Sequence, residues 1–192
     1  VLYIPENFTL MSDDNLAQKY PTYKKPIAMY ESRDKKAEMG VNAAVNTWRN
    51  NNLNILKDMY KSTIASVFAE VDFIQDGTIV EVNGRKFVYF EFTSAIKDDK
   101  RIDETTIVTR RYNYLAYTIY ANRILVFNFN STYISRAEWT QKAVEIMKSI
   151  KVSDKLKLDK YVPFQAAGPQ PKEISGRKDM QMEALKKLNG KK

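Results

Sequence analysis

The chain has 192 residues, of which 44% are hydrophobic and 12% aromatic, which suits one globular domain with an extension and excludes a wholly disordered protein. It contains no Cys and no His, which excludes disulfide bonds, thiolate metal ligands and cysteine nucleophiles and removes the commonest general base. The net charge of +8 lies mostly at one end: residues 151–192 hold ten Lys and one Arg against three Asp and two Glu, a net of +6, which leaves +2 for the first 150 residues.

The first part of the chain is predicted to form short strands around one small helix. Leu2–Ile4 and Phe8–Leu10 are typical of an opening strand that a proline interrupts. Ser12 is a suitable N-cap for a helix, which should end by Tyr20 because the proline that follows disfavours a helical residue before it.

The next segment is predicted to form two strands and a long helix. Ile27–Ser32 and Ala37–Trp48 are the strands, the second with apolar residues on alternate positions. From Leu53 to Val71, apolar residues recur at steps of three and four, which predicts an amphipathic helix of about five turns.

The clearest local signal is a β-hairpin. Asn83-Gly84 separates the β-rich runs Thr78–Val82 and Arg85–Thr93, and both turn residues tolerate the positive φ of a type I′ turn. Two more predicted strands, within residues 105–120 and 123–130, extend this hairpin to an antiparallel meander.

A second long helix should close the body of the domain. Ser135 and Glu138 have the spacing of a capping box, and an apolar stripe from Trp139 to Ile150 follows them. Beyond Ser153 the pattern decays, so we expect a domain over residues 1–152 and a basic C-terminal extension over 153–192. Within the extension only Met180–Leu188 is predicted as a short amphipathic helix.

Several phrases in this order resemble the PsbP/Mog/DcrB-like superfamily over about residues 1–152. They are Phe8-Thr9-Leu10-Met11-Ser12, Asp76-Gly77-Thr78, Val82-Asn83-Gly84-Arg85-Lys86, Trp139 and Ile146-Met147-Lys148-Ser149-Ile150-Lys151-Val152. The resemblance implies an α+β fold, in which an antiparallel β-sheet meander is flanked by helices in a PsbP/Mog-like α/β/α sandwich. It also implies accessory or adaptor roles without catalysis, often in exported proteins or lipoproteins of bacteria. It supplies no catalytic, metal-binding or cofactor-binding residue that this chain matches.

Two groups of acidic residues are weaker candidates for chemistry. The charged loop Ile96–Glu104 offers oxygens for Ca²⁺, but Lys100 and Arg101 interrupt them and the spacing of an EF-hand loop is absent, which favours a solvated connection. Asp72 and Asp76 would act as a catalytic pair only in a cleft around them. We therefore expect no catalytic residue, no metal site and no cofactor.

Two further groups are candidates for protein contact. Tyr112, Tyr114 and Tyr120 share a strand face with Arg110, and tyrosine is enriched at interfaces, although a helix that covers this face is the favoured alternative.

In the extension, a second stripe of apolar residues recurs at spacings that meet on one side of a short helix and favours docking on a partner. It consists of Met180, Met182, Leu185 and Leu188. A disordered extension and an arm that binds phosphates or membranes are the alternatives for this segment.

These observations predict a non-catalytic binding or adaptor domain that acts through protein–protein contacts with an unidentified partner. We expect an exported bacterial protein in the periplasm or cell envelope, anchored as a lipoprotein through a segment before Val1, with a cytoplasmic location as the alternative. The lack of cysteine fits export. The first alternative function is a polyanion-binding or nucleic-acid-binding protein that uses the basic extension, since the nearly neutral body is not expected to bind nucleic acid. A hydrolase that uses acidic residues is the third.

Overall fold

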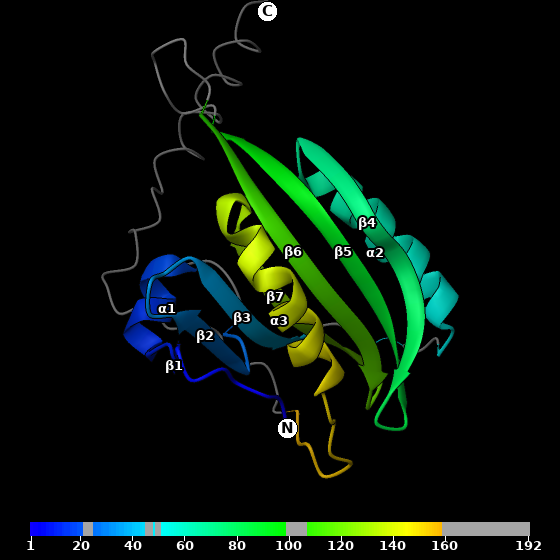
Figure 1. The fold of residues 1–192 in the computed structure, drawn as a ribbon. Helices are drawn as coiled ribbons and strands as arrows, with labels where there is room; N and C mark the ends of the chain where they lie inside the picture. The colour runs from blue at the N-terminus through cyan, green and yellow to red at the C-terminus, as the bar shows by residue number, and fades with distance from the viewer. Residues whose placement is uncertain (21–24, 45–47, 49–50, 99–106, 159–192) are drawn as a thin grey trace, which may run out of the picture.

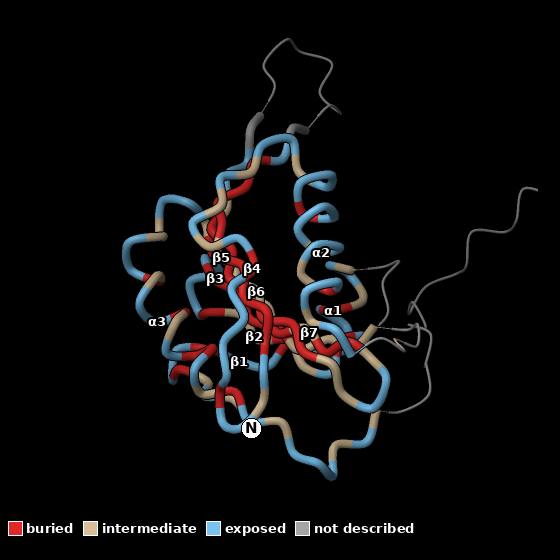
Figure 2. The backbone as a smooth tube through the Cα atoms, turned by 90° about the vertical axis from the view of Figure 1, so that its right-hand side faces the viewer, coloured by how far each residue is buried: buried red, intermediate tan, exposed pale blue. Residues whose placement is uncertain are grey.

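The computed structural model describes residues 1–158 except 21–24, 45–47, 49–50 and 99–106. Seven strands form one antiparallel sheet in the order β1-β2-β3-β7-β6-β5-β4. Helix α3 covers one face of this sheet, and α1 and α2 cover the other, as Figures 1 and 2 show. The predicted α+β fold, a meander flanked by helices in three layers, is confirmed.

The elements are β1 (Phe8–Leu10), α1 (Asp13–Lys19), β2 (Ala28–Ser32), β3 (Ala37–Ala43), α2 (Leu53–Val67), β4 (Glu70–Val82), β5 (Arg85–Asp98), β6 (Ile107–Tyr120), β7 (Arg123–Thr132), the 3₁₀ turn η1 (Tyr133–Ser135) and α3 (Arg136–Lys148).

The face of the sheet under α3 holds the larger core. Trp139 of α3 is 1% exposed. Its ring meets Phe8 edge-on at 5.4 Å between centroids and lies 5.6 Å from Phe129. The Tyr89 hydroxyl donates a hydrogen bond of 3.1 Å to the Met147 carbonyl and so ties β5 to the last turn of the helix. Figure 2 shows the buried strands between the two helical layers.

The opposite face packs against α2 through a second core. Leu56 and Ile64 of α2 are buried against apolar side chains of β5 and β6. Tyr60 stacks on Tyr117 with ring centroids 3.9 Å apart. Because both faces of the central strands are covered, successive residues of β5 and β6 are buried on opposite sides of the sheet.

Both edges of the sheet are unsuited to strand addition. At one edge β1 has three residues. At the other, β4 is long but its pairing with β5 is interrupted twice, between Phe73 and Gln75 and between Asp76 and Thr78. Gly77 lies in the second interruption with a φ of 101°, which glycine adopts without strain. Bulges of this kind bend an edge strand and hinder its pairing with another chain.

The local turn and cap predictions had mixed outcomes. The hairpin is confirmed, since Asn83 and Gly84 have φ values of 50° and 77°. The Ser12 side chain accepts a hydrogen bond from the Asn15 amide as predicted. The capping box at Ser135 is wrong, because η1 precedes α3 and the Ser135 hydroxyl oxygen instead accepts from the Thr132 hydroxyl at 3.1 Å.

Three predicted boundaries also differ. Helix α2 ends at Val67 after about four turns, and the chain from Glu70 already pairs with β5, so the long stripe belongs partly to a strand. Strand β5 continues to Asp98, into the segment predicted as a charged loop. Leu2–Ile4 is not a strand of the sheet; the neighbouring Val1 pairs through its backbone with Lys151 after α3.

Candidate functional site

The predicted tyrosine surface is not an open surface at Tyr112 and Tyr114. Both side chains are buried beneath α3, so the prediction that they form an exposed contact face is wrong and the favoured alternative, a covering helix, is what the structure has. The Tyr112 hydroxyl donates a hydrogen bond of 2.9 Å to a carboxylate oxygen of Glu91. Burial and this carboxylate raise the pKa of Tyr112 well above its ordinary value, and burial raises that of Tyr114 to about 12.

The other two residues of that predicted surface lie far apart in the sheet. Arg110 is half exposed near the start of β6, and its guanidinium reaches across β5 to lie 2.8 Å from the Glu70 carboxylate on β4. Tyr120 lies at the end of the same strand, half-buried, with its hydroxyl on the chain that follows α3. The four side chains therefore do not form one site.

The acidic candidates Asp72 and Asp76 are both exposed. Asp76 pairs with Lys61 at 2.5 Å, and this hydrogen bond lowers the pKa of its carboxyl. Asp72 is exposed on β4. Over the described residues, no group of three or more Asp or Glu side chains is arranged to hold a metal ion. Of the charged loop, residues 99–104 lie outside the described part of the chain, as do Met180, Met182, Leu185 and Leu188.

An apolar cavity of about 420 Å³ lies on the α3 face, beyond the end of that helix. Its floor is one row across three strands, because Ala28 of β2 pairs with Val41 of β3, which pairs with Phe127 of β7. Alternation along each strand places all three side chains on the same face of the sheet. Tyr30, two residues along β2, extends this floor.

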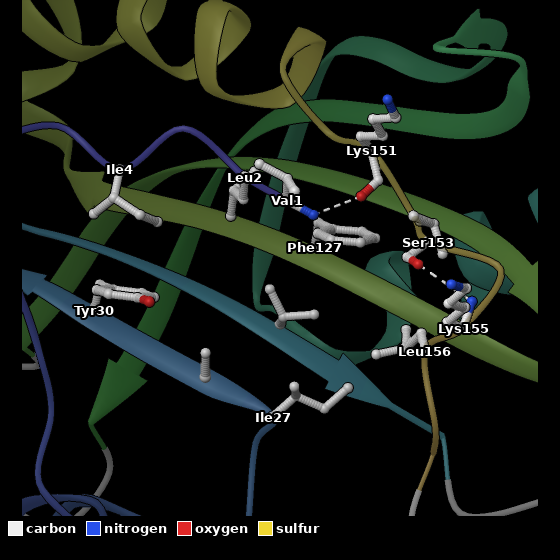
Figure 3. A pocket seen from close by; sticks show the side chains of 13 residues that line it. Val1, Leu2, Ile4, Ile27, Tyr30, Phe127, Lys151, Ser153, Lys155 and Leu156 are labelled. Carbon is white, nitrogen blue, oxygen red and sulfur yellow. Dashed lines mark hydrogen bonds between the residues drawn. The ribbon is translucent and has the colours of Figure 1, made fainter.

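Two irregular segments wall the cavity. The first is the N-terminal segment, residues 1–4, which contributes Leu2 and Ile4. The second is the stretch of residues 151–158 after α3, here called the strap, which contributes Val152 and Leu156. Figure 3 shows these side chains around the space between the strap and the strands, and Figure 1 shows the two segments side by side.

Backbone hydrogen bonds hold the two walls together. The Lys151 amide donates to the Val1 carbonyl at 2.9 Å, and the Val1 nitrogen donates to the Lys151 carbonyl at 2.6 Å. The Tyr3 amide donates to the Ser149 hydroxyl oxygen at 2.8 Å. This pairing joins two segments almost 150 residues apart in the sequence.

The strap is also attached to the sheet beside the cavity. The Tyr120 hydroxyl lies 2.9 Å from both the Asp154 and the Leu156 carbonyl oxygens, and donates its one hydrogen to this pair. The Asn83 side-chain amide donates to the Ile150 carbonyl at 2.8 Å. Arg85 lies over the Tyr120 ring, 5.3 Å from its centroid, and 3.5 Å from the Asp154 carboxylate. The cavity wall thus depends on turn and strand-end residues of the meander.

The lining is suited to binding rather than to acid–base chemistry. Ten of the thirteen lining residues are apolar or aromatic, and the polar ones among these described residues are Lys151, Ser153 and Lys155. Neither a carboxylate nor an imidazole lines it. Ligand pockets in proteins are mostly apolar cavities of about 300–1,000 Å³ with a few polar groups, which this cavity matches.

Sequence reasoning did not find this site. Two signals pointed to it without identifying it: the apolar residues of the opening segment, and the alternation of Leu with Lys from Lys155 onward. Neither signal says that the two segments meet, because that contact arises only in the folded chain.

No protein-family model and no curated protein sequence matches the chain. Among solved structures, cyanobacterial PsbP (CyanoP) of Synechocystis sp. PCC 6803 is similar with a TM-score of 0.54 and 8% identity, over 79% of this chain and 85% of that one. LpqN of Mycobacterium tuberculosis, involved in cell envelope biogenesis, has a TM-score of 0.44 and 8% identity over 78% and 80%. Protein PA94 of Pseudomonas aeruginosa has a TM-score of 0.46 and 5% identity over 79% and 86%. The likeness to CyanoP shows that the chain has a PsbP-like fold, as the sequence resemblance implied.

Proposed function

We propose that this chain is a non-catalytic binding domain of an exported bacterial protein, and that it works as an adaptor. The observation that carries the proposal is the apolar cavity between the N-terminal segment, the strap and the floor of Ala28, Val41 and Phe127. An apolar cavity of this size favours occupation by apolar groups, because their burial removes them from water.

The chemistry of the lining supports binding without turnover. General acid–base catalysis needs a group whose pKa lies near the working pH. Among the described residues, the polar side chains that line the cavity are two hydroxyls and two lysines. The strongest pKa shifts belong to buried tyrosines under the helices, such as Tyr112 and Tyr117, whose raised pKa follows first from burial. These tyrosines contribute to the cores, away from the cavity lining.

Export to the periplasm or cell envelope is the second part of the proposal. It is supported by the PsbP-like fold, by the roles that the family resemblance implies, and by the lack of cysteine. Across the described residues no helix is long and apolar enough to cross a membrane. Fractionation of the producing bacterium tests this part: recovery of the native protein in the cytoplasmic fraction alone would contradict it.

Protein contact is the third part. The sheet edges do not favour strand addition, so we place the contact on the apolar residues of the extension, Met180, Met182, Leu185 and Leu188. Substituting all four by Ser should abolish recovery of a specific crosslinked partner from the native envelope, with the folded body unchanged. An unchanged crosslinking pattern would remove these residues from the proposal.

The binding function is tested with a neutral apolar dye, N-phenyl-1-naphthylamine, whose fluorescence rises in apolar sites. The native chain should bind it at one site. Ala28→Phe, which fills the floor of the cavity, should weaken binding at least tenfold. Ala65→Phe on the exposed face of α2 is the matched control and should bind as the native chain does. Equal binding by both variants would show that the dye lies elsewhere and would remove the observation that carries the proposal.

A second candidate function, polyanion binding by the extension, is favoured by the concentration of positive charge in residues 151–192. Such binding should be sequence-independent and should fall steeply between about 50 and 200 mM salt. Binding of single-stranded DNA that falls with salt and is lost when the chain ends at Leu158 would favour this function. Binding that residues 1–158 perform alone would place it on the folded body and contradict a role of the extension.

A further inference from the structure

We propose that the cavity binds an anionic amphiphile, with a single alkyl chain on the floor of the sheet and the anionic head group at a rim formed by Lys151 and Lys155. This inference rests on the proposed binding function and names the chemical class of the ligand. It combines two independent observations: an apolar interior and a rim with one sign of charge.

The interior suits one alkyl chain. Val41, Phe127 and Leu156 present only hydrocarbon to the cavity. The volume of about 420 Å³ lies at the small end of the range for ligand pockets, about 300–1,000 Å³, which favours a single-chain molecule over a lipid with two chains. The walls are irregular chain rather than helix, and Figure 3 shows lining side chains from the N-terminal segment, the strap and the strands around one space.

The rim is positively charged. Lys151 and Lys155 both line the cavity and both are exposed. Lys157, also exposed, follows on the strap. The acidic residue of the described strap, Asp154, does not line the cavity and pairs with Arg85 at 3.5 Å. A carboxylate, sulfate or phosphate head therefore meets cations and no competing carboxylate at this entrance.

The chain's own extension is the main competing occupant. It begins beside the cavity and carries the apolar residues Met180, Met182, Leu185 and Leu188. However, Lys186 and Lys187 stand among them, and a basic segment is repelled by a rim that already holds Lys151 and Lys155. Charge complementarity thus favours an anionic ligand over this segment.

Titration calorimetry with dodecanoate, dodecyl maltoside and dodecyltrimethylammonium tests the inference on the full chain. Dodecanoate should bind most tightly and the cation most weakly. Shortening dodecanoate to decanoate should weaken binding by up to about fourfold for each methylene removed. The double variant Lys151→Gln, Lys155→Gln should weaken dodecanoate binding about three- to tenfold and leave dodecyl maltoside unaffected, because rim charges in water contribute modestly.

Matched control variants distinguish a change at the cavity from the general effect of removing positive charge or adding a Phe side chain. Lys36→Gln, Lys86→Gln removes the same charge from exposed lysines outside the cavity and should bind dodecanoate as the native chain does. Ala28→Phe should abolish dodecanoate binding, and Ala65→Phe should not.

Three results would overturn the inference. If dodecyl maltoside binds as tightly as dodecanoate and the Lys151/Lys155 variant has no effect, the cavity has no preference for an anionic head group. The inference then fails, while the proposed binding of apolar groups is unaffected. If Ala28→Phe still binds dodecanoate, the amphiphile lies elsewhere. If a chain ending at Leu158 binds dodecanoate more than tenfold more tightly than the full chain, the extension itself occupies the cavity.

Discussion

The α3 face of the sheet consists of two regions that share β7 but are covered in different ways. Under α3, the covering element is a helix that buries Trp139, Ala143, Ile146 and Met147 against the strands. At the cavity, the cover is the N-terminal segment and the strap, which are irregular and held by backbone hydrogen bonds to each other and by the side chains of Tyr120 and Arg85. A helix places a side chain on the sheet at every turn, whereas an extended segment directs alternate side chains away from it. The first region is therefore filled, and the second keeps a cavity.

The largest expected effect separates the two regions by stability. Trp139→Ala should lower the free energy of unfolding by ~3–5 kcal/mol, because it removes a buried ring and leaves a cavity in a packed core. Leu156→Ala, which removes a half-buried side chain from the strap, should cost ~1 kcal/mol. Urea denaturation with an unchanged m value measures both. Equal losses would show that the strap is as tightly packed as α3.

Alkaline pH should act through the tyrosines under α3. Burial raises the pKa of Tyr114 to about 12 and that of Tyr89 and Tyr112 further still. The ordinary pKa of tyrosine is about 10. Below that pH the folded and the unfolded chain both keep these protons, so these tyrosines do not make the free energy of unfolding depend on pH. Above it the unfolded state loses protons that the native state retains. Stability should then fall by up to ~1.4 kcal/mol per pH unit for each tyrosine, until the native groups titrate.

Urea unfolding at several pH values measures this effect. Between about pH 6 and 9 the stability should be nearly constant, because the chain has no His and no Cys to titrate there. Tyr114→Phe should reduce the alkaline fall, whereas Tyr3→Phe, at an exposed position, should not. An identical fall in both variants would show that the buried tyrosines do not cause it.

Truncation tests how much the strap adds to the stability of the domain. Ending the chain after Leu158 should leave the melting temperature within about 1 °C, because in the described part of the chain the helices and the sheet bury their apolar side chains against one another. Ending it after Val152 removes Leu156 and the acceptors of the Tyr120 hydroxyl, and should cost ~1–2 kcal/mol and abolish dye binding. The domain boundary after Val152 stays a prediction until this comparison is made. Unfolding of both truncated chains would place the extension within the core.

The smallest expected effect concerns the attachment of the strap alone. Tyr120→Phe removes the hydroxyl that bonds to the Asp154 and Leu156 carbonyls, and should cost ~0.5–1 kcal/mol. Hydrogen exchange of the amides at 153–157 should accelerate, with the amides of α3 unchanged. If exchange accelerates equally in α3, the strap and the helix open together and the two regions are one cooperative unit.

Sequence patterns predicted those parts of the fold that depend on neighbouring residues. Asn83 and Gly84 form the expected hairpin because a type I′ turn is decided by the φ preferences of two residues. The stripe from Trp139 to Met147 predicted α3, because helical spacing is visible over a few turns. The order of such elements, together with several sequence phrases, resembles the PsbP/Mog/DcrB-like superfamily, and this resemblance implied the PsbP-like architecture.

The burial of Tyr112 and the cavity could not be predicted in the same way. The alternation along β6 shows two faces, but it does not say which one a helix covers, and here both are covered. The pairing of Val1 with Lys151 joins residues 150 positions apart, and no local pattern specifies such a contact.

Composition and local pattern were enough to predict the α+β fold, the concentration of positive charge in residues 151–192, and the lack of histidine and cysteine chemistry. These features depend on residue types and on short-range backbone preferences. The tertiary structure decided which side of the sheet α3 covers and how far β4 extends. It also decided that two apolar segments at opposite ends of the body wall one cavity over Ala28, Val41 and Phe127. The reason is physical: a contact between distant segments is specified by the packing of the whole domain and by hydrogen bonds that the backbone of any sequence can make.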